Sequence, residues 1–78
     1  MINFDKGAAG RVIRRLRKQK KLTQEVLSGL AVMARSHLAM IESGAKEPNF
    51  ETLWRIAYAL NVTPHELVQF IEVECSES

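Results

Sequence analysis

The sequence predicts a compact all-α domain of five short helices. Its 78 residues are about half the length of an average domain, so a single small core is expected. Apolar residues recur at helical spacing along most of the chain, and only 2 prolines and 4 glycines interrupt it. The β-branched runs that are typical of strands are missing. The sequence therefore favours helices throughout, with no sheet.

The first helix is predicted to run from Lys6 to Lys20. A stripe of apolar residues at positions i, i+3, i+4 and i+7 marks its buried side: Ala9, Val12, Ile13 and Leu16. Thr23 is the predicted N-cap of the second helix, because its hydroxyl can accept a hydrogen bond from a free backbone N–H of the next turn. The buried side of that short helix is expected to consist of Leu27, Leu30 and Ala31.

The third helix is predicted from Arg35 to Glu42, and Gly44 is expected to end it in left-handed backbone. Leu38 and Ile41 fall on the core side of a helical wheel. The opposite face carries four residues without a carboxylate: Arg35, Ser36, Ala39 and Met40. This helix is therefore suited to approach a polyanion.

The fourth helix is predicted from its capping residue Asn49 through Leu60. Its core stripe consists of apolar residues at helical spacing: Leu53, Ile56, Ala57 and Leu60. Three aromatic residues recur every four positions beside this stripe: Phe50, Trp54 and Tyr58. Their expected role is packing in the core and between helices, with a subunit or effector contact as the alternative.

The fifth helix is predicted over residues 64–74. The segment Thr63-Pro64-His65-Glu66 combines a capping box with proline at the first helical position. Residues 1–5 are expected to form an N-terminal arm and residues 75–78 a fraying tail. The folded domain is accordingly predicted to span residues 6–74.

Composition excludes several classes of protein. The chain has no apolar run of the ~18 residues that a membrane span needs, and its N-terminus lacks the form of a secretory signal. Cys75 is the 1 cysteine and is expected to be an inert thiol, while the segment at His65 lacks the second histidine of a zinc motif. No nucleophile–base set or carboxylate pair is found. We expect a cytoplasmic protein that is not an enzyme and holds no metal or cofactor.

Positive and negative charges are separated along the chain. Residues 1–46 carry 10 Lys+Arg and 3 Asp+Glu, whereas residues 47–78 carry 1 and 6. The formal net charge of +2 thus conceals a basic first part and an acidic second part. Because electric fields act locally, the basic part is expected to bind a polyanion and the acidic part to face away from it.

Residues 22–44 read LTQEVLSGLAVMARSHLAMIESG, which is a short capped helix, a tight turn and a second helix with an acid-free outer face. This segment resembles the helix-turn-helix of the Xre/Cro/cI family of phage-repressor-like regulators, with the motif at about residues 23–42. The flanking residues 11–17, 48–53 and 56–62 look like the family's first helix, fourth helix and exit. The resemblance covers residues 11–67 and implies a five-helix DNA-binding domain of the phage-repressor type.

The resemblance and the shape of DNA together imply roles for single residues. An α-helix fits the major groove of B-DNA, where each base pair presents a distinct pattern of donors and acceptors. Arg35 is expected to donate two N–H bonds to guanine O6 and N7. The other expected base contacts are Ser36, Ala39 and Met40, and the expected phosphate contacts are Gln24, Thr23, His37, Ser43, Lys46 and Arg14. The family pattern also implies a structural ion pair between Arg17 and Glu42.

The sequence departs from that family pattern in three places. At one of them, Ser28 and Gly29 stand where alanine and a polar residue are common, which weakens the second helix a little. Val32 occupies a turn position where glycine is usual because the backbone there is left-handed. A β-branched residue in that conformation costs about 1–2 kcal/mol, a cost that an altered turn would avoid. Ala34 replaces the usual Ser or Thr cap of the third helix, which forfeits about 1 kcal/mol.

The fifth helix carries more apolar surface than docking onto the core requires: Leu67, Val68, Phe70, Ile71 and Val73. This excess predicts a homodimer, since a two-fold interface presents the same patch twice. The predicted function is a transcriptional regulator that binds a palindromic operator in double-stranded DNA, with residues 35–42 in the major groove and half-sites ~34 Å apart. The alternative is an antitoxin or adaptor that holds a protein partner with its apolar C-terminal helix.

Overall fold

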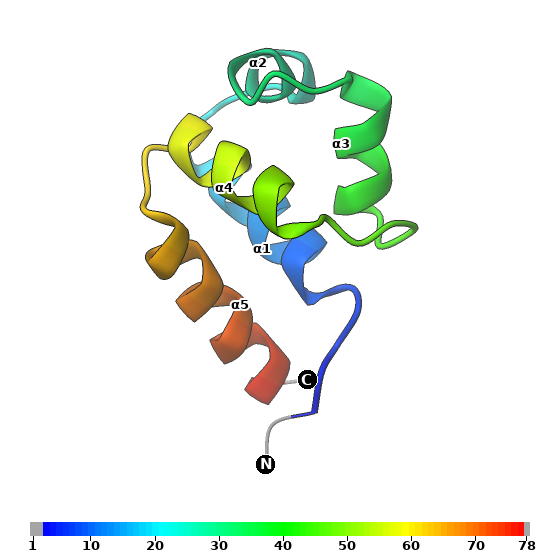
Figure 1. Ribbon diagram of the computed structural model, residues 1–78, viewed down its shortest axis with the longest axis vertical. Coiled ribbons are helices and arrows are strands. Elements are labelled where there is room, and N and C mark those ends of the chain that lie inside the picture. Colours follow the sequence, from blue (N-terminus) through cyan, green and yellow to red (C-terminus); the bar gives the residue numbers. More distant parts are fainter. Residues whose placement is uncertain (1–2, 78) are drawn as a thin grey trace.

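Five helices account for most of residues 3–77, the part of the chain that the computed structural model describes. In chain order they are α1 (Ala8–Gln19), α2 (Gln24–Leu30), α3 (Arg35–Glu42), α4 (Phe50–Ala59) and α5 (Pro64–Glu77) (Figure 1). Across residues 3–77 no strand is formed. The predicted all-α fold is therefore confirmed, and the start of each helix lies within two residues of its predicted place.

Polar side chains begin three of these helices as the sequence predicts. Thr23 and Asn49 cap α2 and α4, because each accepts a hydrogen bond from the backbone N–H three positions on, at 3.1 and 2.8 Å. Thr63 and Glu66 form the reciprocal capping box of α5, with hydrogen bonds of 2.8 and 3.1 Å. These local contacts explain why the helix starts could be predicted from the sequence alone.

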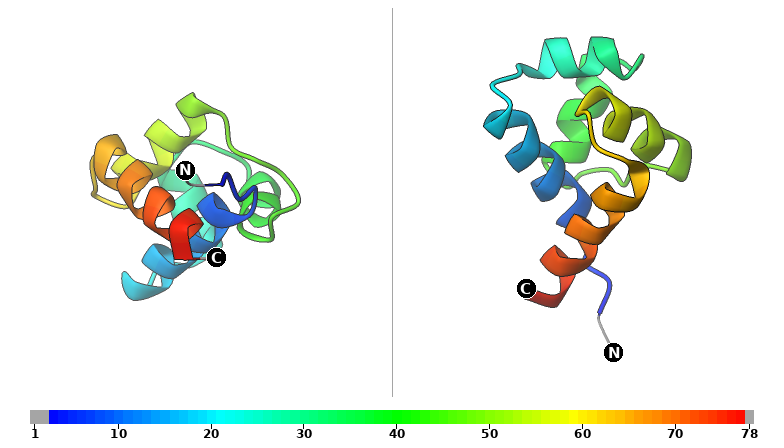
Figure 2. Two further views of the ribbon diagram at one scale, coloured as in Figure 1. Left: turned by 90° about the horizontal axis from the view of Figure 1, so that it is seen from below. Right: turned by 90° about the vertical axis from the view of Figure 1, so that its left-hand side faces the viewer.

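The core lies where all five helices meet. Helix α1 packs against α3 and α5, α2 packs against α3 and α4, and α4 packs against α5 (Figure 2). The buried apolar residues form one cluster: Val12, Ile13, Leu16, Leu27, Ala31, Leu38, Ile41, Ile56, Ala57, Leu60 and Leu67. Because α3 is held from one side by α1 and α2, its opposite face remains free.

Helix α1 approaches α3 more closely than any side chain would allow. A Cβ atom added at Gly10 would lie 1.9 Å from the carbonyl oxygen of Ile41 and 3.2 Å from the Cα of Glu42. Only a residue without a side chain fits between these backbones. Gly10 therefore sets the distance between α1 and α3, a role that was not predicted from the sequence.

The prediction of a fraying tail at residues 75–78 is wrong for residues 75–77, because α5 continues to Glu77. Residue 78 and residues 1–2 of the predicted arm lie outside the described residues. Cys75 is buried, because it lies on the same side of α5 as the core residue Leu67. The end of α5 is also tied to α1, since Glu74 accepts hydrogen bonds from Arg11 at 2.8 Å and Arg15 at 3.0 Å. These two interactions extend the helix beyond its predicted end.

The acidic second part of the chain therefore does not wholly face away from the basic first part. The guanidinium groups of Arg11 and Arg15 lower the pKa of the Glu74 carboxyl, chiefly through these hydrogen bonds. Asp5, in the arm, also pairs with Arg11 and accepts a hydrogen bond from the backbone N–H of Gly7 at 2.8 Å. Two of the basic side chains of α1 are thus engaged within the domain.

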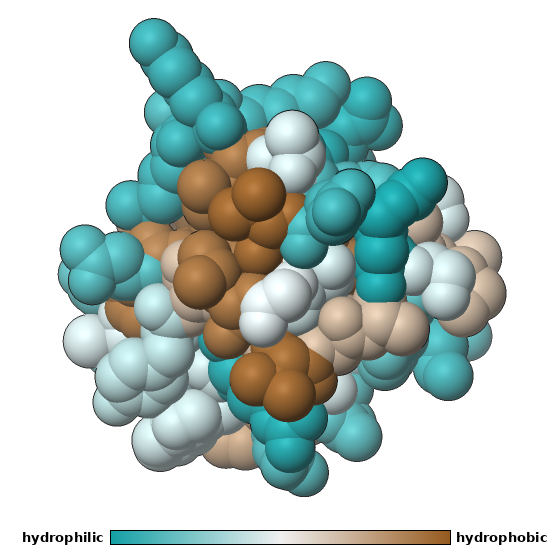
Figure 3. Space-filling model, turned by 90° about the horizontal axis from the view of Figure 1, so that it is seen from above, coloured by the Kyte–Doolittle hydropathy of each residue, from teal (hydrophilic) through white to brown (hydrophobic). Residues whose placement is uncertain are grey.

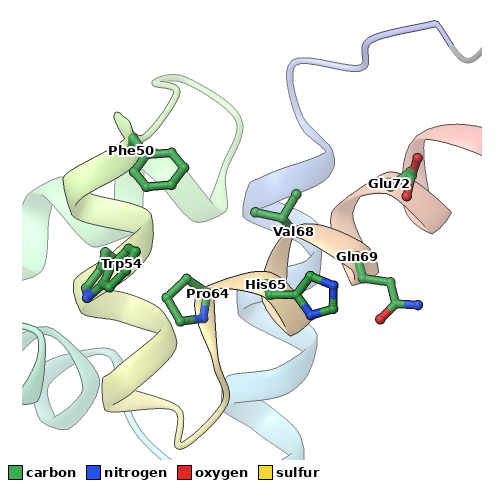
Figure 4. A pocket seen from close by; sticks show the side chains of 7 residues that line it. All are labelled: Phe50, Trp54, Pro64, His65, Val68, Gln69 and Glu72. Carbon is green, nitrogen blue, oxygen red and sulfur yellow. The ribbon is translucent and has the colours of Figure 1, made fainter.

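The aromatic residues of α4 do not pack in the core, and the prediction that they would is wrong. Phe50, Trp54 and Tyr58 are exposed and lie in a row along the outside of α4, with neighbouring rings tilted to each other and successive ring centroids 6.1 Å apart. Phe50 and Trp54 border a hollow of about 470 Å³ whose other wall is α5, where Val68 faces them across the gap (Figure 4). The core stripe of α4 is complete without these rings, so they are left on the surface.

Candidate nucleic-acid interface

The turn between α2 and α3 keeps its left-handed backbone. Val32 has a φ of +55°, and hydrogen bonds from its N–H and that of Met33 return to the last turn of α2, at 3.2 and 2.9 Å. The β-branched side chain has therefore not altered the turn. Its strain of about 1–2 kcal/mol is retained in the folded domain.

Arg55 of α4 stabilises this turn through a hydrogen bond to its backbone. Its Nη1 donates to the carbonyl oxygen of Val32 at 3.3 Å, and its guanidinium also pairs with Glu51 one turn earlier on α4. No role for Arg55 was predicted from the sequence, although it is the 1 Lys or Arg among residues 47–78.

Within residues 3–77, the side chains on the outer face of α3 have no hydrogen-bonding or ion-pair partner. Arg35 and Ser36 at the start of the helix are exposed, and within residues 3–77 the Arg35 guanidinium makes no hydrogen bond or ion pair. Met40 is 42% exposed, while His37 and Ala39 are half-buried. As expected, Ala34 gives α3 no side-chain cap. The four predicted base-contacting residues thus lie on one acid-free surface.

A buried ion pair fixes the orientation of α3. Arg17 of α1 donates from Nε and Nη2 to the two carboxylate oxygens of Glu42, at 2.7 and 2.9 Å, and from Nη1 to the carbonyl oxygen of Leu22 at 2.8 Å. The two side chains are only 10% and 3% exposed. The hydrogen bonds from Arg17 to Glu42 raise the pKa of the guanidinium. This pair, which the family resemblance implied, joins the end of α1, the entry to α2 and the end of α3.

The residues predicted to contact phosphates differ in whether their side chains already make hydrogen bonds within the domain. Within the described part of the chain the side chains of Arg14 and Lys46 are exposed and have no partner. The amide of Gln24 donates to Glu42 at 3.1 Å. The Thr23 hydroxyl accepts the cap hydrogen bond of α2, and the Ser43 hydroxyl donates to the backbone of its own helix at 3.0 Å. The half-buried His37 completes this set.

A helix-turn-helix family model matches residues 13–67 of the chain. The chain belongs to the helix-turn-helix family. It is 39% identical over 54 residues to an HTH-type transcriptional regulator of Sinorhizobium fredii, an alignment that covers 69% of this chain and 70% of the relative. It is also 39% identical over 59 residues to the immunity repressor protein of Bacillus phage phi105, covering 76% of this chain but only 41% of the phage protein.

Two solved structures share the fold of this helix-turn-helix protein. The restriction-modification controller protein C.AhdI from Aeromonas hydrophila has a TM-score of 0.77 and 33% identity, with 81% of this chain and 96% of that chain covered. The clp gene regulator ClgR from C. glutamicum has a TM-score of 0.83 and 22% identity, with 94% and 95% covered, and shows the fold alone. The predicted Xre/Cro/cI resemblance is confirmed, and the protein is a DNA-binding transcriptional regulator by family; the antitoxin alternative is not favoured.

The predicted dimer residues of α5 do not form one surface in this helix-turn-helix protein. Leu67 is fully buried in the core and Ile71 packs against it, so Leu67 is not available to a partner. Val68, Phe70 and Val73 remain exposed. Val68 and Phe70 point about 160° apart around the helix. The prediction is therefore wrong for Leu67. Part of the side of α5 that was assigned to the dimer contact packs into the core of the domain itself.

Within residues 3–77, no helix combines the length and apolarity that crossing a membrane requires. Among residues 3–77 no three His, Cys, Asp or Glu side chains gather where they would hold a metal ion.

Proposed function

We propose that this helix-turn-helix protein binds a palindromic operator as a homodimer, with α3 of each copy in the major groove. The observation that carries the proposal is the outer face of α3, where Arg35 is exposed and unpaired within residues 3–77. The Arg17–Glu42 pair holds this helix against the domain while its other side stays open. A rigid helix with a free, acid-free face fits the groove in which bases are distinguished.

The base contacts follow from the chemistry of that face. Arg35 would donate two parallel N–H bonds to O6 and N7 of a guanine, and Ser36 would bond a neighbouring base edge. Ala39 and Met40 would contact thymine methyl groups, since apolar contact is how a helix reads thymine. Specificity is thus expected to depend on four residues of α3.

The phosphate contacts lie on both sides of α3. Arg14 and Lys46 have free cationic side chains, and Thr23 keeps its own O–H proton because its cap bond uses the oxygen as an acceptor. His37 lies at the edge of the α3 face, and Gln24 would share its amide with Glu42. Ser43 would first give up its bond to the backbone. These contacts would set position and affinity without reading sequence.

Selection of bound fragments from a random pool of duplex DNA tests this proposal directly. The enriched fragments should share a palindrome whose half-sites are about one helical turn apart. Binding to them should weaken by several decades as salt rises, because about 6–10 phosphate contacts release counterions. The proposal would fail if no sequence were enriched, or if affinity did not depend on salt.

Replacement of Arg35 with alanine should relax the preference at one operator position in each half-site. The expected loss of discrimination is about 1–3 kcal/mol, the usual value of a bidentate arginine–guanine contact. Arg35→Lys should relax the same position while keeping the charge. Lys46→Ala is the matched control, since losing a phosphate contact should weaken binding to all sequences alike. Unchanged base preference in Arg35→Ala would remove Arg35 from its assigned role.

The dimer contact is proposed to involve α5 and the aromatic side of α4. Val68 lies next to the hollow bordered by Phe50 and Trp54, so this side exposes more apolar surface than the side with Phe70 and Val73 (Figure 4). A ridge of rings beside a hollow is self-complementary under a two-fold axis, since each copy supplies both shapes.

Val68→Glu is therefore expected to give a monomer in sedimentation experiments, while Val73→Glu, placed on the other side of α5, should leave the dimer intact. Trp54 is the 1 tryptophan of the chain, so its emission reports on the same surface. In the unmodified protein this emission should shift to shorter wavelength as concentration rises. The opposite pattern in the two variants would assign the contact to Phe70 and Val73.

A further inference from the structure

The two ends of α3 are held in different ways. At its end, the buried pair of Arg17 and Glu42 joins α3 to α1. At its start, Ala34 supplies no side-chain cap, and the chain arrives directly from the turn that follows α2. Arg35 is the first residue of α3, so its position depends on how that turn is held.

Val32 does not hold this turn through its side chain. That side chain is 74% exposed, and Leu30, which was predicted to be buried, is 59% exposed. Figure 3 shows hydrophobic side chains on the surface at this end of the molecule. The left-handed backbone of Val32, at φ +55°, is a conformation that glycine or asparagine adopts more readily than a β-branched residue. Because such strain persists only where the surrounding structure fixes the backbone, contacts to the backbone must hold the turn.

One peptide group of the turn is fixed from both sides. The N–H of Met33 donates to the carbonyl oxygen of Ser28 in α2, at 2.9 Å. The carbonyl oxygen of Val32, in the same peptide group, accepts from Nη1 of Arg55 in α4, at 3.3 Å. A rotation of Val32 out of the left-handed region would reorient this peptide group and break both hydrogen bonds. Arg55 thus ties the turn to α4, a helix outside the helix-turn-helix motif.

Glu51 orients the guanidinium of Arg55. It lies one turn earlier on α4 and pairs with Nη2, which leaves Nη1 directed at the carbonyl oxygen of Val32. A guanidinium presents its donors in a rigid fork, so binding at one nitrogen sets the direction of the other. The side chains of Arg55 and Glu51 are 48% and 71% exposed. Either can therefore be replaced without opening the core.

We infer that Arg55 is a positioning residue for base recognition. It holds the turn at Val32 and thereby fixes the start of α3, from which Arg35 reaches its base. The inference rests on the proposed DNA binding and deepens it. A binding group must be held within about 0.5 Å and 10–20° of its productive geometry, so a small rotation of the first turn of α3 weakens a bidentate contact.

The effect is confined to one end of α3. Ala39 and Met40 lie closer than Arg35 to the end of the helix that the buried ion pair fixes. The base positions that these two residues are proposed to read should therefore depend little on Arg55. This contrast separates a positioning role from a general contribution to stability, which would affect all positions alike.

Arg55→Met tests the inference, because it keeps the apolar stem of the side chain and removes its donors and charge. On the fragments selected from the random pool, discrimination at the position that Arg35→Ala relaxes should fall about 5-fold, the usual effect of losing one hydrogen bond. The salt dependence of binding should stay as it is in the unmodified protein. Lys46→Ala is the control, since loss of a phosphate contact should weaken the salt dependence and lower affinity for all sequences alike.

Two further variants show whether Arg55 acts through the turn. Glu51→Ala leaves Arg55 in place without its partner and should shift the same base position by a smaller factor, so it also serves if Arg55→Met does not fold by circular dichroism. Asparagine adopts left-handed backbone more readily than valine, so a turn with Val32→Asn needs Arg55 less. In that background Arg55→Met should reduce discrimination by less than about 2-fold, because two changes that act through one element are not additive.

The outcomes distinguish this inference from the proposed function. Unchanged discrimination in the folded Arg55→Met and Glu51→Ala variants, or an equal fall with and without Val32→Asn, overturns the positioning role alone. An even loss of affinity with a weaker salt dependence overturns it too, since Arg55 would then be a phosphate contact. If the unmodified protein selects no sequence, or if Arg35→Ala relaxes no position, the proposed base recognition fails and the positioning role fails with it.

Discussion

Replacement of Glu42 with alanine is expected to remove a large part of the stability of the domain. The change leaves the charge of the Arg17 guanidinium buried without its partner, because Arg17 is 10% exposed and donates two of its three hydrogen bonds to Glu42. Removing one partner of a buried pair costs about 3–5 kcal/mol. A chain of this length has a total stability of roughly 4–12 kcal/mol, so the loss is a large part of it. Thermal unfolding followed by circular dichroism should show a drop of at least about 12 °C.

Two further variants show whether burial is the reason. Glu51→Ala breaks an exposed arginine–glutamate pair on α4 and should cost no more than about 1 kcal/mol. The double variant Arg17→Met, Glu42→Leu removes both charges and should regain most of the lost stability, because no charge is left buried alone. Equal losses in Glu42→Ala and Glu51→Ala would show that the buried pair is not the cause. In the double variant DNA binding should stay weak, since the pair that joins α1 to α3 is gone.

Replacement of Gly10 with alanine is expected to destabilise the domain although alanine is the better helix former. The new Cβ would lie 1.9 Å from the carbonyl oxygen of Ile41, and a backbone atom cannot swing away as the end of a side chain can. Helices α1 and α3 would have to separate, at a cost of about 3 kcal/mol, the upper end of what overpacking usually costs. Denaturation by urea should show the loss as a lower midpoint.

Gly29→Ala provides the matched control for this change. Gly29 also lies in a helix, but a Cβ there would have no atom within 4 Å. The substitution should therefore stabilise the protein by about 0.5–1 kcal/mol through helix propensity. A gain of similar size in Gly10→Ala would contradict the close approach of α1 and α3. Because α3 is the helix proposed to enter the groove, its displacement by Gly10→Ala should also weaken DNA binding.

The helices and their starts were predictable because the signals for them are local. Apolar spacing and the caps at Thr23, Asn49 and Thr63 act within one or two turns of chain, and the structure has all three caps. The acid-free face of α3 was predictable for the same reason. Its residues follow from the same wheel that places Leu38 and Ile41 inside.

Exposure could not be predicted where a helix has more apolar residues than its neighbours can cover. Leu27, Leu30 and Ala31 of α2 were all predicted to be buried, but only Leu27 and Ala31 are. The rings of Phe50 and Trp54 were left outside because α5 lies across a hollow from them. Such choices depend on which helices pack together, and helical periodicity contains no information about that.

The sequence by itself determined an all-α helix-turn-helix domain, the caps of its helices and the face of α3 that is proposed to read DNA, because each depends on residues within a few positions of one another. The tertiary structure alone decided that Gly10 must be glycine, that Arg55 supports the turn at Val32 and that Glu74 extends α5 by pairing with α1. It also decided which apolar side chains remain for partners. These features join residues far apart in the chain, and only packing brings such residues together.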